Sequence, residues 1–165
     1  MRAWGDSLAL LQIEPSRSDF CNAVIRTRNF RLNSDSFSGA SKHRTYSQYN
    51  IFTDGSRTGG QTGSGFTIYR GHTEIECRSL RLPDYASVFQ AQIFAIFRAA
   101  DTLLSRQSDN PRFVKIFVDS QAALKALINP KITSRLVRDT VLKLNLLGSR
   151  TKAVTLVWIL SLIHI

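Results

Sequence analysis

The chain has little cysteine, and this shortage excludes two kinds of structural framework. Only Cys21 and Cys77 occur in 165 residues, and they form no C-x-x-C pair. A zinc site and a disulfide framework are therefore not expected. This cysteine usage fits a reduced intracellular compartment, the cytoplasm or the nucleus, so we expect a protein that is not secreted.

Long apolar runs are also lacking. The last apolar stretch, Ala153 to Ile165, falls short of the roughly 20 residues that a membrane span needs. The stretch Leu8–Leu11 is too short, and too close to Asp6 and Glu14, to be the core of a signal peptide. We therefore expect no membrane segment.

Acidic residues are scarce relative to basic ones. The chain has 22 Lys and Arg against 12 Asp and Glu, a net charge of +10, with a pI of about 10.3. Residues 1–47 hold 7 basic and 4 acidic residues (+3), and residues 48–165 hold 15 and 8 (+7). The excess favours an acidic partner, most often nucleic acid, although small basic proteins without a specific partner also exist.

Serine-rich composition divides the chain near residue 47. Residues 33–47 are rich in serine and also contain Gly39, a composition that is typical of a linker. We therefore expect residues 1–47 to be a poorly ordered N-terminal segment with a Ser-rich linker, and residues 48–165 to form one domain.

Two apolar runs in this domain end on an aspartate. Ile51-Phe52-Thr53 leads to Asp54, and Ile116-Phe117-Val118 leads to Asp119. Two strands that each end on a carboxylate can bring both to one edge of a sheet, where they would bind a hard divalent cation. An ordinary Asp-Gly turn at Asp54-Gly55 is the alternative.

The remaining pattern predicts an α/β sheet. A glycine cluster at residues 59–65 precedes a strand pattern and contains no Gly-Lys-Ser/Thr, so it is interpreted as a turn between paired strands and not as a phosphate loop. We expect antiparallel strands ending near residues 54, 69 and 80, helices over residues 85–105, 120–128 and 132–147, and buried strands over residues 113–118 and from residue 153 onward. Asp84 is the expected cap of the first helix.

Some polar residues stand out on the predicted helices. Gln92 lies in the apolar face of the first helix, and a polar side chain there needs a buried partner or the edge of a site. Lys131, Arg135 and Arg138 share one side of the third helix and are candidates for binding nucleic acid, together with Gly55 and Ser56. A solvated helix face is the simpler interpretation of the three cations.

These blocks together resemble a known family. Ile51–Ser56, Ser87–Ile96, Ile116–Leu124 and Val154–Ile159 are similar, in order and spacing, to the ribonuclease H (type 1) domain of non-LTR retrotransposon polyproteins. The resemblance covers roughly residues 48–160. It implies a ribonuclease H-like three-layer fold: a five-stranded mixed sheet, its first three strands antiparallel, with helices on both faces. The family's last helix is expected to be missing here.

The resemblance also implies an activity, the Mg²⁺-dependent hydrolysis of the RNA strand of an RNA–DNA hybrid. The family uses four carboxylates around two metal ions. Asp54 and Asp119 match two of them, Gln92 stands at the glutamate position, and the fourth has no counterpart. His164 does not align with the family histidine.

The missing carboxylates therefore imply impaired activity. The alternatives are a non-catalytic module that binds nucleic acid or the hybrid, and a decayed retrotransposon fragment.

Overall fold

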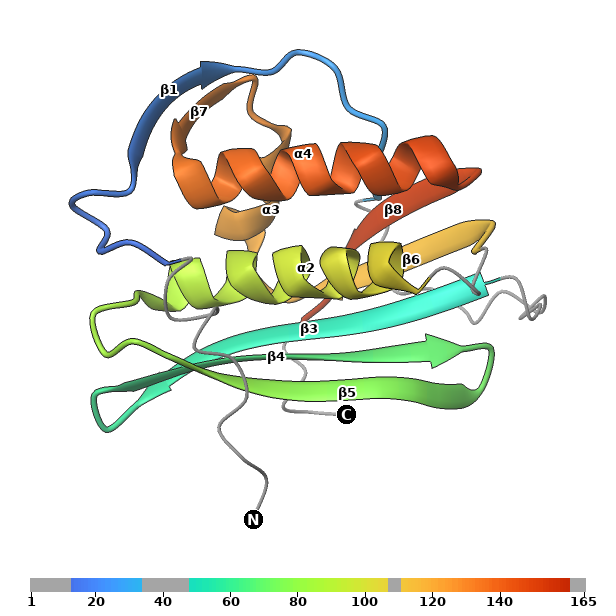
Figure 1. Ribbon diagram of the computed structural model, residues 1–165, viewed down its shortest axis with the longest axis horizontal. Helices are drawn as coiled ribbons and strands as arrows, with labels where there is room; N and C mark the ends of the chain where they lie inside the picture. Colours follow the sequence, from blue (N-terminus) through green and yellow to red (C-terminus); the bar gives the residue numbers. More distant parts are fainter. Residues whose placement is uncertain (1–12, 34–47, 107–110, 161–165) are drawn as a thin grey trace.

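A six-stranded mixed sheet organises the protein. The computed structural model describes residues 13–33, 48–106 and 111–160 (Figure 1). Across the sheet, the strands are β2 (Arg31–Asn33), β8 (Ala153–Trp158), β6 (Phe113–Val118), β3 (Gln48–Thr58), β4 (Gln61–Arg70) and β5 (Thr73–Leu82). As expected, β3, β4 and β5 are antiparallel, while β2, β8, β6 and β3 run parallel. This mixed α/β arrangement is compatible with a three-layer α/β fold, but β2 makes the sheet one strand wider than the five predicted.

The β3–β4 hairpin shows why the glycine cluster is a turn. Gly59 and Gly60 connect the two strands with φ angles of 58° and 76°. Two consecutive residues with positive φ are typical of the type I′ turn, whose twist matches that of the flanking strands. The glycines therefore serve the hairpin, as the sequence indicated.

Each helix of the described residues begins after a serine. Ser87, Ser120 and Ser134 cap α2 (Val88–Ser105), α3 (Gln121–Ile128) and α4 (Arg135–Arg150) by accepting a hydrogen bond from a backbone N–H of the first turn. At α2, the cap is thus Ser87 and not Asp84. Residues 132–134, expected to begin the third helix, instead belong to strand β7 (Lys131–Ser134).

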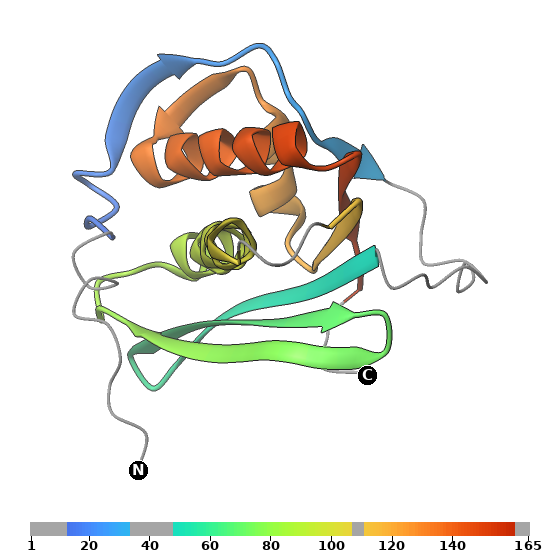
Figure 2. The same ribbon diagram turned by 45° about the vertical axis from the view of Figure 1, so that its right-hand side comes forward.

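The helices pack on one face of the sheet. Figures 1 and 2 show α2, α3 and α4 on the same side, over a core that includes Ile51, Ile116 and Leu156. We expected helices on both faces, but the helices of the described residues cover only this one. The other face has a smaller apolar cluster in which the Phe52 and Phe117 rings stack, with centroids 4.8 Å apart. None of the described helices is long and apolar enough to cross a membrane.

Residues 13–33 pack along the outer side of the helices (Figure 2). Strand β1 (Phe20–Val24) pairs with β7 in a separate two-stranded sheet, and β2 joins the edge of the main sheet. Ile13 and Phe30 are part of the main core. The boundary predicted near residue 47 falls outside the described residues, but residues 13–33 contribute to the same hydrophobic core as the predicted domain.

Candidate active site

The two aspartates singled out in the sequence lie beside each other where β3 and β6 separate. The last β3–β6 pair is Phe52 with Phe117, and each aspartate lies two residues further along the chain, Asp54 still within β3 and Asp119 just past the end of β6. Thr53 fixes this place, because its Oγ1 donates a buried hydrogen bond of 3.0 Å to the carbonyl oxygen of Phe117. Asp54 is exposed and Asp119 is half-buried.

The electrostatics of Asp119 reflect this proximity. Burial raises the pKa of the Asp119 carboxyl above its ordinary value, and the negative charge of Asp54 raises this pKa further. Its Oδ1 atom is buried and has no hydrogen-bond partner among the described residues. A buried carboxylate oxygen without a donor is unfavourable, and a bound cation would relieve it.

Gln92 comes close to the same place because α2 packs directly on β3. A methyl group placed on Gly55 would lie 2.5 Å from the backbone nitrogen of Gln92 and 2.8 Å from its Cγ. Gln92 is half-buried, next to the strand residue that follows Asp54. The structure therefore brings together all three residues predicted for the catalytic site.

Two β4 side chains that the sequence analysis missed position this part of α2. Ser64, the cross-strand partner of Gly55, donates a 2.7 Å hydrogen bond to the carbonyl oxygen of Ala91. Thr62 donates at 2.8 Å to Ala86, just before the helix. Both are fully buried or nearly so. The sequence did carry a signal for these two residues. Thr62 and Ser64 take core-facing positions of the strand just before Phe66, where a hydroxyl group needs a hydrogen-bond acceptor.

The residues predicted to bind nucleic acid do not form one surface. Gly55 is buried against α2, whereas Ser56 is exposed. Lys131 lies on β7, not on the helix. Arg135 pairs with Glu14, and Arg138 pairs with Asp139, whose hydrogen bond raises the pKa of Arg138.

These three cations are also separated from the aspartates. Figure 1 shows β7 and β1 on the side of the helices away from the six-stranded sheet. The predicted ridge of Lys131, Arg135 and Arg138 is therefore partly neutralised by acidic partners, and it does not adjoin the Asp54–Asp119 pair.

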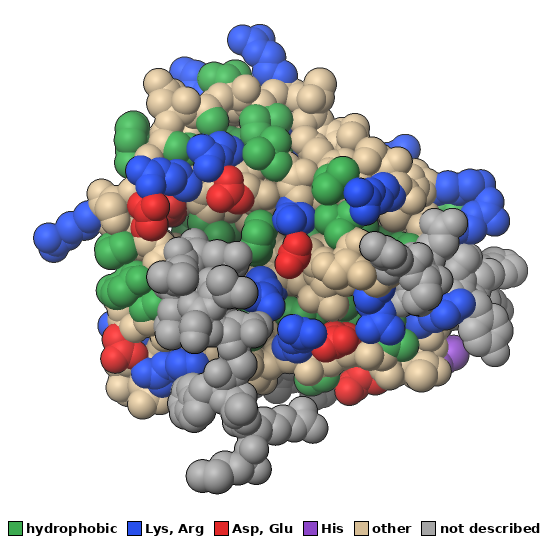
Figure 3. Space-filling view, viewed as in Figure 1, with side chains coloured by type: hydrophobic (Ala, Val, Ile, Leu, Met, Phe, Trp, Pro, Cys, Tyr) green, Lys and Arg blue, Asp and Glu red, His purple; other side chains and the backbone are tan. Residues whose placement is uncertain are grey.

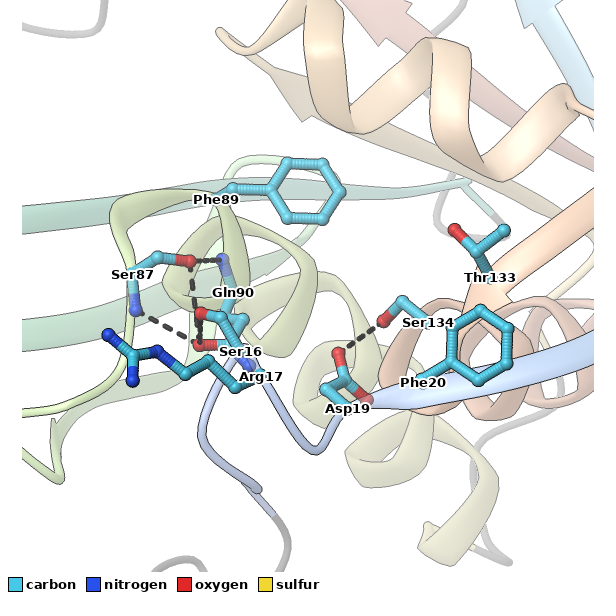
Figure 4. A pocket seen from close by; sticks show the side chains of 9 residues that line it. All are labelled: Ser16, Arg17, Asp19, Phe20, Ser87, Phe89, Gln90, Thr133 and Ser134. Atoms are coloured by element: carbon cyan, nitrogen blue, oxygen red, sulfur yellow. Dashed lines mark hydrogen bonds between the residues drawn. The ribbon is translucent and has the colours of Figure 1, made fainter.

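A cavity of about 310 Å³ lies elsewhere, between residues 16–20 and the beginnings of α2 and α4 (Figure 4). Its polar groups bond mainly to one another. The Gln90 amide oxygen accepts from Ser16 and from the Ser87 backbone, and Asp19 accepts from Ser134. Because these partners belong to the protein, the cavity is a junction between the N-terminal segment and two helices.

The donors at the aspartate pair suit one divalent cation. Asp54 and Asp119 offer carboxylate oxygens, and the Gln92 amide could add a neutral oxygen, the ligand type that Mg²⁺ and Ca²⁺ prefer. Within residues 13–33, 48–106 and 111–160, no three His, Cys, Asp or Glu side chains gather as a metal-binding group. Two negative charges balance one divalent ion, not two.

No protein-family model and no curated protein matches this chain.

Proposed function

We propose that this chain is a ribonuclease H-type domain that hydrolyses the RNA strand of an RNA–DNA hybrid, with impaired activity. One observation carries the proposal: the buried, unpartnered Oδ1 of Asp119 lies at the end of a strand beside a second carboxylate, Asp54. A pair of carboxylates at neighbouring strand ends of a mixed sheet supports a site for a divalent cation, which metal-dependent hydrolysis of a phosphodiester needs. The net charge of +10 is consistent with a nucleic-acid substrate.

The chemistry is an in-line displacement at phosphorus. The oxygen of a water molecule bonds to phosphorus while the bond from phosphorus to the 3′ oxygen of the RNA breaks. Divalent cations supply the activated water and stabilise the leaving oxygen when they are bound. The role of Asp54 and Asp119 is to hold the cation, and Thr53 and Gly55 keep Asp54 and Gln92 in place.

The charge of the site explains why activity is impaired. Two ions carry four positive charges, whereas Asp54 and Asp119 supply two negative charges and the Gln92 amide supplies none. Hard cations bind more weakly as the charge of their ligands falls. The second ion is therefore the one that this site binds poorly.

A cleavage assay on an RNA–DNA hybrid in Mg²⁺ tests the proposal. We expect weak cleavage by the wild type, none by Asp54→Asn, and a gain in rate for Gln92→Glu, which adds the third carboxylate. Gln61→Glu adds the same charge at the β3–β4 turn and should leave the rate unchanged. Cleavage that survives Asp54→Asn would show that a contaminant or another site is responsible.

A second candidate is a non-catalytic module that binds the hybrid. It is favoured by the large positive charge and by the fact that, among the residues placed by the structure, no third acidic side chain joins Asp54 and Asp119. This candidate predicts binding with a steep salt dependence and no cleavage by either the wild type or Gln92→Glu. Salt-independent binding would contradict it.

A further inference from the structure

Four exposed cations gather at the end of the sheet where β8 and β6 begin. We name this surface the basic edge, and it consists of Arg31, Arg112, Arg150 and Lys152. In Figure 3, Lys and Arg side chains lie on the right of the view, the side on which β6 and β8 begin in Figure 1.

Backbone pairing holds these cations near one another. The N–H groups of Lys152 and Ala153 both donate to the carbonyl oxygen of Arg112, at 2.8 and 3.2 Å. Arg150 is the last residue of α4, two residues before Lys152. Arg31 lies on β2 opposite Thr155 of β8. Because neighbouring strands are about 4.8 Å apart, Arg112 and Lys152 lie beside each other where β6 and β8 begin, and Arg31 lies on the adjacent strand, level with the third residue of β8.

Some cations of the described residues have acidic partners, whereas those of the basic edge do not. Ion pairs form at Arg78, Arg81, Arg106, Arg135, Arg138 and Lys143. In the part of the chain that the structure describes, none of the four cations of the basic edge forms one. Their mutual repulsion is therefore uncompensated by the protein, and it would be relieved by an external polyanion.

An aromatic ring accompanies the charges. Phe113 directly follows Arg112 and is 42% exposed. By strand alternation it shares a face of the sheet with Lys115 and, through the register of Lys115 with Thr155 and of Thr155 with Arg31, with Arg31 of the basic edge. Cations beside an exposed aromatic ring are typical of surfaces that bind single-stranded nucleic acid, where bases stack on the ring.

The basic edge is separate from the candidate active site. Arg112 precedes β6 and Asp119 follows it, so the two lie at opposite ends of the strand, about 23 Å apart at 3.3 Å per residue. Binding there needs neither a metal nor the aspartates, and it does not depend on the proposed cleavage.

We propose that the basic edge binds single-stranded nucleic acid, with its cations on the phosphates and Phe113 against a base. A membrane surface would need a larger apolar group beside the charges, and Phe113 is a single ring. Single strands differ from the hybrid proposed as substrate, so the two ligands can be measured separately.

Fluorescence anisotropy with a labelled 12-nucleotide oligo-dT in EDTA tests this proposal. The Arg112→Gln/Lys152→Gln variant should bind at least tenfold more weakly at 100 mM salt, with a salt slope smaller by about 1.4, which is two phosphate contacts. The matched control, Arg26→Gln/Lys125→Gln, removes the same charge from exposed positions elsewhere and should keep the wild-type slope. Equal loss in both double variants would mean that net charge alone attracts the strand, and would overturn the proposal.

Further variants separate stacking from charge and binding from catalysis. Phe113→Leu should weaken binding about fivefold or more without changing the salt slope, because stacking involves no phosphate. Asp54→Asn should bind the oligonucleotide as the wild type does. Arg31→Gln/Arg150→Gln repeats the charge test should the first pair fail to show a wild-type thermal transition. Stronger binding to vesicles with 30% phosphatidylserine, or to polyglutamate, than to oligo-dT would also overturn the proposal.

Discussion

Gly55 and Gln92 meet without a side chain between them: the position of a Gly55 Cβ would be 2.5 Å from the Gln92 backbone nitrogen. The beginning of α2 therefore lies directly on β3, closer than any residue with a side chain would allow. This contact sets the distance between the Gln92 amide and the strand that carries Asp54. The geometry of the candidate site thus depends on a hydrogen atom at residue 55.

Replacement of Gly55 by alanine should destabilise the protein. The new methyl group would meet the backbone of Ala91 and Gln92, which cannot rotate away, so we expect a loss of about 1–3 kcal/mol in the free energy of unfolding. Urea unfolding measures it. Gly63→Ala is the control, because its Cβ would be 3.8 Å from the Leu80 carbonyl oxygen, an ordinary contact. A similar loss in both variants would show that the approach of α2 to β3 is not the cause.

The raised pKa of Asp119 predicts a pH-dependent stability. A carboxyl that binds its proton more tightly in the folded state stabilises the fold fully below its ordinary pKa of 3.8, and this contribution is lost as the pH rises through the folded-state pKa. Charged Asp119 is thus unfavourable at neutral pH. We expect Asp119→Asn to raise the Tm at pH 7 in EDTA, and the gain to vanish below the ordinary carboxyl range.

Two comparisons check the cause of this effect. Asp54→Asn removes the negative charge that adds to the raised pKa of Asp119. It should therefore reduce the pH dependence of the Tm without abolishing it, since burial is the larger cause of the raised pKa. Mg²⁺ should raise the Tm of the wild type more than that of Asp119→Asn. A Tm of Asp119→Asn at or below the wild type at pH 7 would contradict the prediction.

Local patterns were sufficient to predict the centre of this fold. The strands before Asp54 and Asp119 could be recognised because each is a short run of apolar and β-branched residues followed directly by a charged one. Gln92 stood out because a polar residue interrupted an apolar helix face. The parallel pairing of β3 with β6, which the sequence predicted, brings the two aspartates together, and the packing of α2 on β3 adds Gln92.

Non-local contacts explain what the sequence did not predict. Ile132 fits the apolar stripe of the following helix, so β7 was included in that helix, although Ser134 marks the true cap. Residues 20–33 were placed in the poorly ordered N-terminal segment because their strands have no partner nearby in sequence. These strands pair with β7 and β8, more than 100 residues further along the chain. Such pairings depend on the folded helices that they cover.

Arg28 provides a test of how residues 13–33 are held. Its guanidinium donates to the carbonyl oxygens of Leu127, Ile25 and Asn129 at 2.8, 2.6 and 2.9 Å. Lysine keeps the charge but lacks the planar fork that reaches several acceptors. Arg28→Lys should therefore lower the free energy of unfolding by about 1–2 kcal/mol and speed tryptic cleavage within residues 26–31.

The control for this variant is Arg26→Lys. The Arg26 side chain is exposed, so its replacement should change neither the stability nor the rate of cleavage. Unchanged proteolysis in Arg28→Lys would mean that strand pairing alone holds the segment.

Gln90 joins the cap of α2 to the N-terminal segment, and glutamate at this position separates the two roles. The Gln90 Oε1 accepts from the Ser87 backbone in a capping box, in which glutamate serves equally well. The Nε2 donates at 2.8 Å to the Glu14 carbonyl oxygen, which a carboxylate cannot do. Gln90 is only 2% exposed, so Gln90→Glu would bury a charge opposite an acceptor. We expect a loss of about 2 kcal/mol or more in the free energy of unfolding.

The same substitution should show where the loss arises. Helix α2 should remain formed by far-ultraviolet circular dichroism because the capping bond persists, while residues 13–19 should lose protection from hydrogen exchange because their tether to α2 is gone. Ser16→Ala removes only the longer 3.2 Å bond to Gln90 and should cost less than half as much. If Gln90→Glu instead lost helix content and left the exchange of residues 13–19 unchanged, the capping role would be dominant. In that case the Glu14 contact would contribute little to holding the segment against the two helices.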